Sequence, residues 1–214
     1  MLGAIIFANG ELRHPKVILD MIRSTDLLIA VNGGAAHCRD LGLSPSVIIG
    51  DLDSLEEELI SNYIAQGADV FQHPTRKNET DLELAILYAV ERDLDEIIIF
   101  GASGARWDMT LANVLLLAHP RASNLMIKIS DGRQNIYIVR DGETLEIDGN
   151  PGDTVSLIPL KGKVEGVTTT NLEYSLENST LNFASTRGIS NVLLDSQASV
   201  HITKGMLLTI VNHN

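Results

Sequence analysis

Short, continuous apolar runs alternate with segments of helical periodicity through the first 130 residues. The apolar runs lie at residues 3–8, 27–31, 47–49, 97–100 and 125–129, and helical periodicity covers 17–23, 55–67, 82–92 and 111–119. Strands that are apolar throughout are typical of a sheet buried on both faces. Strands and helices in alternation therefore predict an α/β domain with a mainly parallel, doubly wound sheet.

Two of the predicted helices begin with a Ser/Thr-x-x-Glu capping box. Ser54 is followed by Glu57, and Thr80 is followed by Glu83, each time just before an apolar run. In this motif the hydroxyl accepts a hydrogen bond from a backbone N–H that the first helical turn leaves free. We expect helix starts at both places.

The pattern changes near residue 131. Short strands are expected at 136–139, 144–147, 154–159, 179–183, 199–202 and 206–210, separated by turn signals such as DG, GNPGD and KGK. This part of the chain has no helical period of useful length. We therefore predict two domains, an α/β domain over 1–130 and an all-β sandwich over 131–214.

Charge and cysteine content exclude several classes of function and location. The formal net charge is −12, which disfavours nucleic acid as a partner because such binding depends on Lys and Arg at the phosphates. A polyphosphate ligand would need a divalent cation to offset the repulsion. We expect no membrane span and no secretory signal, and the single cysteine, Cys38, suits a cytoplasmic protein and a buried packing role.

Polar residues follow the predicted strands at the edge where a parallel sheet binds its ligands. They are Asn9-Gly10, Asn32-Gly33-Gly34, Asp51 and Asp53 after Gly50, and the run Gly101–Asp108, which contains Ser103, Gly104 and Arg106; Asp81 opens a nearby helix. The glycines and the arginine suit phosphate oxygens. Asp51 and Asp53, at i and i+2 after a strand, are expected to face the same way, and such paired carboxylates suit Mg²⁺. Each also has a purely structural explanation: Asp81 favours a helix N-terminus and Asp108 is a possible N-cap.

Several segments together resemble the thiamine pyrophosphokinase family. NGGAAHCRDLGLSPSVIIGDLDS is similar to its DGG turn and IGDxDS strand end, KNETDLELAI to its KDxTDxExAL segment, and GASGARWDMTLANVLLL to its GATGGRxDHxLxN helix. In the second half, GDTVSLIPLKGKVEGVTTTNLEYSL and STLNFASTRGISN resemble the thiamine-contacting domain of the family. The similarity runs in order from about residue 9 to the end.

The resemblance implies an ATP-dependent, Mg²⁺-requiring homodimer with thiamine held between subunits. It assigns Mg²⁺ and the ATP phosphates to Asp51, Asp53 and Asp81, with Lys77 and Thr80 beside them. The nucleotide and transfer site would be lined by Asn9, Gly10, Asn32, Gly33, Gly34, Ser103, Gly104, Arg106 and Asp108. Thiamine would be contacted by Ser185, Thr186, Arg187, Ser190 and Asn191.

Four positions depart from the family pattern. Asn32 and Asn78 stand where the family has Asp, Ala105 replaces a glycine, and Met109 replaces a histidine. Asparagine keeps the size and the acceptor oxygen of aspartate but not its charge. We therefore expect hydrogen bonding to survive at positions 32 and 78 while the metal site loses negative charge.

The reaction implied is attack of the thiamine hydroxyl on the β-phosphorus of ATP, with AMP as the leaving group. Alignment and charge neutralisation by Mg²⁺ and Arg106 would carry catalysis, with Asp81 or Asp108 as general base. Alternatives are the same fold acting on another alcohol such as a hydroxymethylpterin, a non-catalytic thiamine- or nucleotide-binding protein, and, more distantly, a metal-dependent phosphohydrolase.

Overall fold

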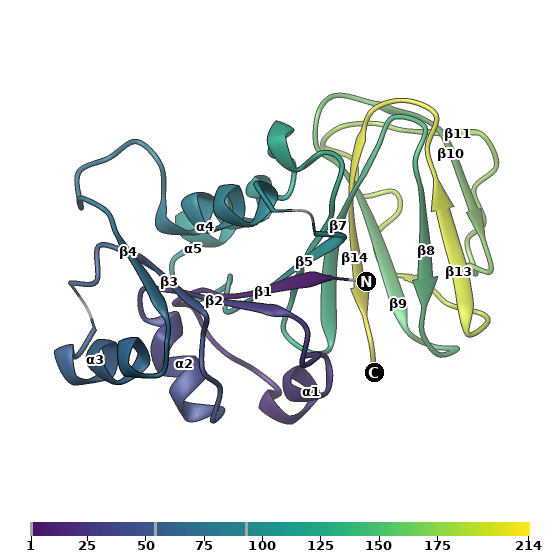
Figure 1. The fold of residues 1–214 in the computed structure, drawn as a ribbon. Coiled ribbons are helices and arrows are strands. Elements are labelled where there is room, and N and C mark those ends of the chain that lie inside the picture. Colours follow the sequence, from purple (N-terminus) through teal and green to yellow (C-terminus); the bar gives the residue numbers. More distant parts are fainter. Residues whose placement is uncertain (1, 54, 93) are drawn as a thin grey trace. The chain divides into compact units, whose positions relative to one another are not determined.

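A computed structural model describes residues 2–53, 55–92 and 94–214, and Figure 1 shows their fold. The chain divides into two compact units, residues 1–132 and 133–214. Within the described residues, no helix has both the length and the apolar character that crossing a membrane requires.

The first unit is built on a six-stranded sheet. Its strands are β1 (Gly3–Phe7), β2 (Leu27–Val31), β3 (Val47–Gly50), β4 (Asp69–Gln72), β5 (Glu96–Phe100) and β6 (Met126–Ser130). All pair in parallel, in the order β6-β5-β1-β2-β3-β4. The order reverses between β5 and β1, so the loops after these two strands diverge and leave space at the sheet edge.

Helices cover both faces of this sheet. They are α1 (Pro15–Asp20), α2 (Gly34–Asp40), α3 (Glu57–Ala65), α4 (Asp81–Val90) and α5 (Trp107–Leu116), with a 3₁₀ turn, η1 (Pro120–Ala122). Figure 1 shows α1, α2 and α3 on one face and α4 and α5 on the other. Because both faces are covered, the central strands are buried along their whole length, as their uninterrupted apolar runs predicted.

Local sequence signals predict where some helices begin but not where others do. The Thr80 hydroxyl accepts a hydrogen bond from Glu83 N–H at 3.2 Å, which confirms Thr80 as the N-cap of α4. Ser54 lies outside the described residues, and α3 begins later than expected, with Glu56 at its N-cap. Helix α5 starts at Trp107, four positions before the predicted 111; its first turn is largely exposed, so it does not belong to the apolar run by which the helix was predicted.

Strand β4 and helix α2 of the first unit were not predicted. Strand β4 is exposed or half-buried at each position and therefore lacks the continuous apolar run by which the other strands were identified. Helix α2 follows a glycine pair and has only seven residues, too few to display a helical period.

The second unit consists of antiparallel strands in two sheets. Its strands are β7 (Gln134–Arg140), β8 (Thr144–Asp148), β9 (Thr154–Pro159), β10 (Val164–Thr170), β11 (Ser179–Leu181), β12 (Asn191–Val192), β13 (Gln197–His201) and β14 (Met206–Asn212). The sheets have the orders β12-β9-β14-β7 and β11-β10-β13-β8. Strand β10 was missed because Gly166, at φ 67°, interrupts its apolar alternation where the pairing with β11 shifts register.

Both sheets contribute to one apolar core in this unit. Val155, Leu157 and Leu207 come from the first sheet, and Val164 and Val200 come from the second; all are fully buried. This is the inward-facing packing of two sheets that share a core.

A buried carboxylate holds the end of β14 to the start of β9. Asp153 is 1% exposed, and its oxygens accept hydrogen bonds from the backbone N–H groups of Asn150 and Asn214, both at 3.0 Å, and from His213 Nδ1 at 2.8 Å. Burial raises the pKa of Asp153, but these hydrogen bonds lower it below its ordinary value.

Candidate active site

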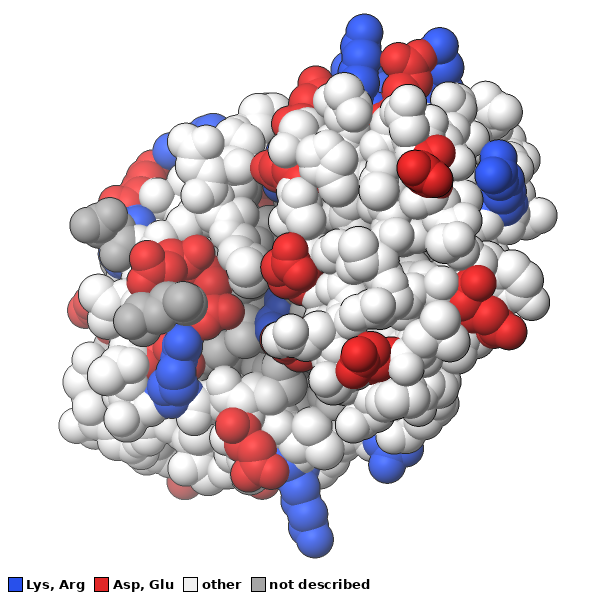
Figure 2. Space-filling view, turned by 90° about the vertical axis from the view of Figure 1, so that its right-hand side faces the viewer, with Lys and Arg blue, Asp and Glu red and all other residues white. Residues whose placement is uncertain are grey.

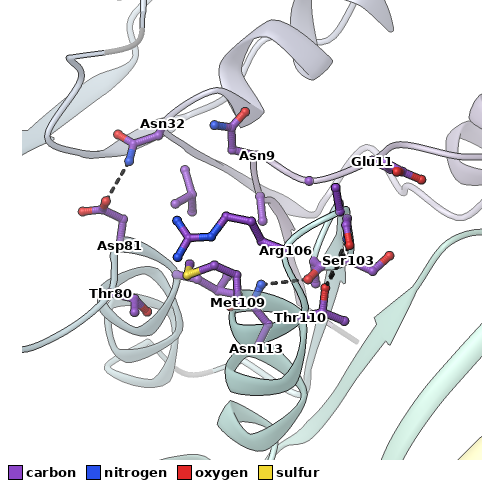
Figure 3. Close-up of a pocket in the computed structure, with 18 of the residues that line it drawn as sticks. Asn9, Glu11, Asn32, Thr80, Asp81, Ser103, Arg106, Met109, Thr110 and Asn113 are labelled. Atoms are coloured by element: carbon purple, nitrogen blue, oxygen red, sulfur yellow. Dashed lines mark hydrogen bonds between the residues drawn. The ribbon is translucent and has the colours of Figure 1, made fainter.

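A cavity of about 880 Å³ opens at the sheet edge where the strand order reverses. Its walls are the segments that follow β1, β2, β3 and β5, the approach to α4, and the first turns of α4 and α5. Figure 3 shows the polar side chains of this cavity. A cavity of this size at a topological switch point is typical of a nucleotide-sized ligand site.

Backbone hydrogen bonds tie together the two loops that diverge at the switch point. Gly10 N–H donates to the Gly101 carbonyl and Glu11 N–H donates to the Ser103 carbonyl, both at 2.7 Å. A Cβ at position 10 would lie 2.3 Å from the Ser103 oxygen, so only glycine allows this approach. His37 Nε2 lies 2.8 Å from the Gly10 carbonyl and supports the same turn from α2.

Asp81 is a half-buried carboxylate of the cavity with two side-chain partners. Its Oδ1 lies 2.8 Å from Lys77 Nζ, and both side chains are less than a fifth exposed. Its Oδ2 accepts a hydrogen bond of 2.7 Å from the Asn32 amide, drawn as a dashed line in Figure 3. Four predicted residues, Asn32, Lys77, Thr80 and Asp81, therefore lie together at one end of the cavity.

Asp51 lines the cavity, but Asp53 does not belong to its wall. The two carboxylates were expected to face the same way as i and i+2 residues of an extended segment. Leu52 has a left-handed φ of 63°, so the chain turns between them and that periodicity does not apply. Asp53 instead accepts a hydrogen bond of 3.1 Å from the Thr75 hydroxyl at the exposed rim.

The cavity fits a magnesium–polyphosphate ligand better than a metal held by protein alone. Among residues 2–53, 55–92 and 94–214, no three His, Cys, Asp or Glu side chains are grouped so that they could hold an ion. Asp51 and Asp81 nevertheless both line the same cavity. One or two carboxylates completed by substrate phosphates and water are the usual surroundings of Mg²⁺.

The glycine-rich loop after β5 is held from below by α5. Gly104 N–H donates to the Thr110 hydroxyl at 3.2 Å, and Asn113 Nδ2 donates to the Ala102 carbonyl at 2.7 Å. Ser103, Gly104 and Arg106, all predicted, line the cavity. The loop therefore presents its backbone to a ligand from a rigid support.

Arg106 and Asp108 form an exposed ion pair at the cavity mouth. Arg106 Nε lies 3.2 Å from Asp108 Oδ1, and hydrogen bonds from Arg106 lower the pKa of Asp108. Arg106 lines the cavity and Asp108 does not. Asp81, which does line the cavity, is therefore better placed than Asp108 to reach a bound hydroxyl.

Gly33 and Gly34 were predicted to line the site, but they shape it from behind. A Cβ on Gly33 would lie 1.9 Å from Asn9 Oδ1, and one on Gly34 would lie 1.9 Å from the Phe7 carbonyl. Neither glycine belongs to the cavity wall. They allow α2 to approach β1 closely, so that Asn9 and Gly10, which do line the cavity, keep their positions.

Sequence reasoning missed several cavity residues, among them Thr110 and Asn113. Asn113 is 7% exposed, and its Oδ1 accepts no hydrogen bond from the described residues. The signal for Asn113 is the final N of the GATGGRxDHxLxN pattern, and Thr110 lies at i−3 from it, which places both on one face of α5.

The five residues expected to contact thiamine lie between β11 and the start of β12 in the second unit. Ser185, Thr186 and Arg187 are exposed on the loop, and Ser190 has a left-handed φ of 57°. Asn191 is 3% exposed, and its amide is already paired with the backbone of Tyr174. Asn191 therefore holds this loop in shape, while its neighbours present polar groups to solvent.

The cavity has an excess of negative charge. Four carboxylates line it, those of Glu11, Asp51, Glu79 and Asp81, against two cations, Lys77 and Arg106, which leaves a formal charge of −2. Figure 2 shows one face of the molecule, where the Lys and Arg side chains of the described residues form no continuous basic patch. An added cation would offset the repulsion between this charge and a phosphate ligand.

Comparisons with known proteins agree along the chain. The family model described as "Thiamin pyrophosphokinase, catalytic domain" matches residues 18–129, and "Thiamin pyrophosphokinase, vitamin B1 binding domain" matches 142–207. The chain is 33% identical to thiamine pyrophosphokinase of Bacillus subtilis (strain 168), over 92% of this chain and 94% of that protein.

Solved structures give the same result. The fold is similar to that of a thiamine pyrophosphokinase from Bacillus subtilis, with a TM-score of 0.88, 29% identity and full coverage of both chains. A Geobacillus thermodenitrificans structure matches with a TM-score of 0.85 and 27% identity, over 100% of this chain and 98% of that one.

Proposed function

The chain belongs to the thiamin pyrophosphokinase family, and we propose that its cavity is where diphosphate passes from ATP to the hydroxyl of thiamine. The products are thiamine diphosphate and AMP. The observation that carries the proposal is the meeting of Asp51, Lys77, Asp81 and Arg106 around one cavity at the topological switch point. These are the charge types that phosphoryl-group transfer requires.

In the proposed reaction, the thiamine hydroxyl oxygen forms a bond to the β-phosphorus of ATP while the bond from that phosphorus to the α-β bridging oxygen breaks. AMP takes the bonding electrons, and the hydroxyl proton passes to Asp81. Arg106 and Lys77 provide positive charge beside the transferred group, and the fixed loops align the reactants.

Asp51 and Asp81, with Asp53 at the rim, are the residues we propose to hold Mg²⁺ together with the ATP phosphates. Bound there, Mg²⁺ supplies charge neutralisation at the phosphate oxygens. The formal charge of the cavity supports this assignment, since two cationic side chains alone do not balance a triphosphate.

We propose that the loop carrying Ser185, Thr186, Arg187 and Ser190 contacts thiamine, with Asn191 holding its base, and that two chains assemble so that thiamine lies between them. Large apolar side chains left exposed in each unit support assembly, among them Trp107 and Leu111 on α5, and Tyr174, Phe183 and Leu194 in the second unit. Light scattering should give twice the chain mass of 23.2 kDa, and a monomer mass would refute the dimer. We also propose a cytoplasmic location, supported by Cys38 as a free, buried thiol.

Thiamine-dependent release of AMP from ATP and Mg²⁺ tests the proposal directly. Asp51→Asn should reduce turnover by about 100-fold or more, because the substitution removes a carboxylate from the polyphosphate site. Asp69→Asn, which neutralises an exposed carboxylate on β4, is the matched control and should leave turnover unchanged. Equal activity of Asp51→Asn and wild type would refute the placement of the site.

The same assay separates the remaining alternatives. Replacing thiamine with a hydroxymethylpterin tests for a different alcohol acceptor, and turnover on the pterin alone would overturn the substrate assignment. Tight thiamine binding by calorimetry without AMP release would indicate a non-catalytic binding protein, the alternative motivated by Asn32 and Asn78.

A further inference from the structure

Asn32 occupies a conformation and a position that few residue types can fill. It follows β2 directly and has a left-handed φ of 46°, a region that asparagine and glycine tolerate better than other residues. Its side chain lies against the backbone of Gly50, where a Cβ would come within 1.8 Å of Asn32 Oδ1. The amide is thereby held between the end of β3 and the cavity.

Both ends of this amide are used. Oδ1 accepts a hydrogen bond from Leu52 N–H at 3.2 Å, and Nδ2 donates one to Asp81 Oδ2 at 2.7 Å. The partners fix the orientation, because a backbone N–H can only donate and an ionised carboxylate can only accept. An ionised aspartate at position 32 would serve the first partner but would place its charge against that of Asp81.

The two partners belong to the two acidic segments of the site. Leu52 lies between Asp51 and Asp53, and Asp81 opens α4 on the other side of the cavity. Lys77 meets the second oxygen of Asp81, so this carboxylate is held from two directions. Asn32 is therefore the side chain that links the turn after β3 to the carboxylate at the start of α4 (Figure 3).

We propose that Asn32 is a positioning residue, whose amide fixes the Asp81 carboxylate relative to the turn that carries Asp51. This inference rests on the proposed function, in which Asp51 and Asp81 flank the ATP phosphates. It also accounts for an amide at a position where the family segment has an acid. Here the group donates a hydrogen bond to Asp81 instead of adding a further charge.

Two substitutions distinguish the contact of Asn32 with the Leu52 N–H from its contact with Asp81. Asn32→Asp keeps the acceptor for Leu52 N–H but loses the donor to Asp81, whereas Asn32→Gly suits the left-handed backbone and removes both contacts. Hydrogen exchange of the Leu52 amide, measured by NMR without nucleotide or metal, should be near wild type in Asn32→Asp and about tenfold faster in Asn32→Gly. Unchanged exchange in Asn32→Gly would overturn the contact with the turn.

Steady-state kinetics test the contact with Asp81. Both variants should lose about 10- to 100-fold in kcat, the loss expected when a reacting group is misplaced, with the KM for thiamine within about twofold of wild type. Wild-type kcat in both variants would overturn the proposal. A loss confined to the KM for ATP would also overturn it, since Asn32 would then be a simple binding contact.

A double variant provides the matched control. Asn32→Asp combined with Asp81→Asn restores a hydrogen bond between positions 32 and 81 with donor and acceptor exchanged. Its melting temperature should return toward wild type from that of Asn32→Asp alone, and a melting temperature at or below that of Asn32→Asp would contradict the pairing. If wild type releases no AMP with thiamine, the proposed function fails, while the exchange and melting measurements still decide whether Asn32 holds Asp81 and the turn.

Discussion

Single side chains in this protein gain their roles from their partners more than from their type. Asp81 and Asp108 both open a helix, yet Asp81 faces the cavity between Lys77 and Asn32, whereas Asp108 pairs with Arg106 at the exposed mouth. Of the two, only Asp81 lines the cavity, so Asp81 is the residue that we propose as proton acceptor.

We predict that Asp81→Asn lowers kcat by about 100-fold or more, the range typical of losing a general base. Asp108→Asn should cost about tenfold at most, because Asp108 only orients Arg106 from outside the cavity wall. Initial rates of AMP release for the two purified variants provide the comparison. A larger loss in Asp108→Asn than in Asp81→Asn would reverse the assignment of the base.

At the scale of residues, the sequence predicted which residues line the cavity better than it predicted where their side chains point. Asp51, Asp81, Lys77 and Arg106 do line one cavity. Asp53 was expected beside Asp51, but the left-handed Leu52 turns the chain, and a side-chain period assumes extended backbone. Asn113 is the final residue of the segment that matches GATGGRxDHxLxN, but no role was predicted for it, because its hydrogen bond to the Ala102 carbonyl appears only once the loop folds back onto α5.

At the scale of elements, the contacts that shape the cavity are the hydrogen bonds between neighbouring loops. The turn after β1 lies directly against the loop after β5, with Gly10 at their closest approach. Because there is no space for a side chain there, the shape of the cavity floor depends on one missing Cβ.

Gly10→Ala should lower the free energy of unfolding by about 1–3 kcal/mol, the usual cost of forcing added atoms into a packed region. Gly104→Ala is the matched control in the same cavity, because its Cβ would find no atom closer than 3.8 Å. That control should change stability by about 0.5 kcal/mol or less. Urea unfolding measures both, and equal stabilities of the two variants would contradict this account.

In the second unit, Asp153 connects the end of β14 to the start of β9. Its pKa is lower in the folded state, so its stabilisation is present above its unfolded pKa of about 3.9 and is lost as the pH falls through the folded value. Asp153→Asn should cost about 2 kcal/mol at pH 7, the worth of hydrogen bonds to a charged group. The difference from wild type should shrink below about pH 4.

Chemical denaturation at pH 7 and at pH 3 measures this difference. Asp148→Asn, at an exposed carboxylate on β8, is the control and should have little effect at either pH. A cost for Asp153→Asn that is the same at both values would show that its charge does not matter.

Elements with a continuous apolar run or a capping box were predictable, and α4 is the best example because Thr80 and Glu83 mark its start. Elements without their own signal were not. Strand β4 forms because β3 offers it a partner edge, and β10 continues past Gly166 because β11 and β13 flank it. Such strands depend on tertiary pairing, which local sequence does not encode.

Over the whole molecule, acidic residues dominate, with a formal charge of −12. This field repels ATP and attracts thiamine, whose thiazolium ring is cationic. The two substrates therefore approach the same protein against opposite long-range forces.

Raising the ionic strength from about 10 to 150 mM should lower the KM for ATP by about twofold and raise that for thiamine by a similar factor, because salt screens both interactions. Free Mg²⁺ must be held constant during the titration. Parallel changes in both constants would indicate a general effect of salt on the enzyme and would contradict the electrostatic explanation.

The burial of Cys38 has a practical consequence. This thiol is fully enclosed between α2 and the sheet, burial raises its pKa to about 12, and it is the single cysteine of the sequence. A thiol reagent at pH 8 can modify it only when the α/β unit opens, so native protein should label about 100-fold more slowly than protein in urea. The rate at which the mass of one label is added therefore reports how often this unit opens. Slower labelling in the presence of ATP and Mg²⁺ would measure how much nucleotide binding stabilises the closed state.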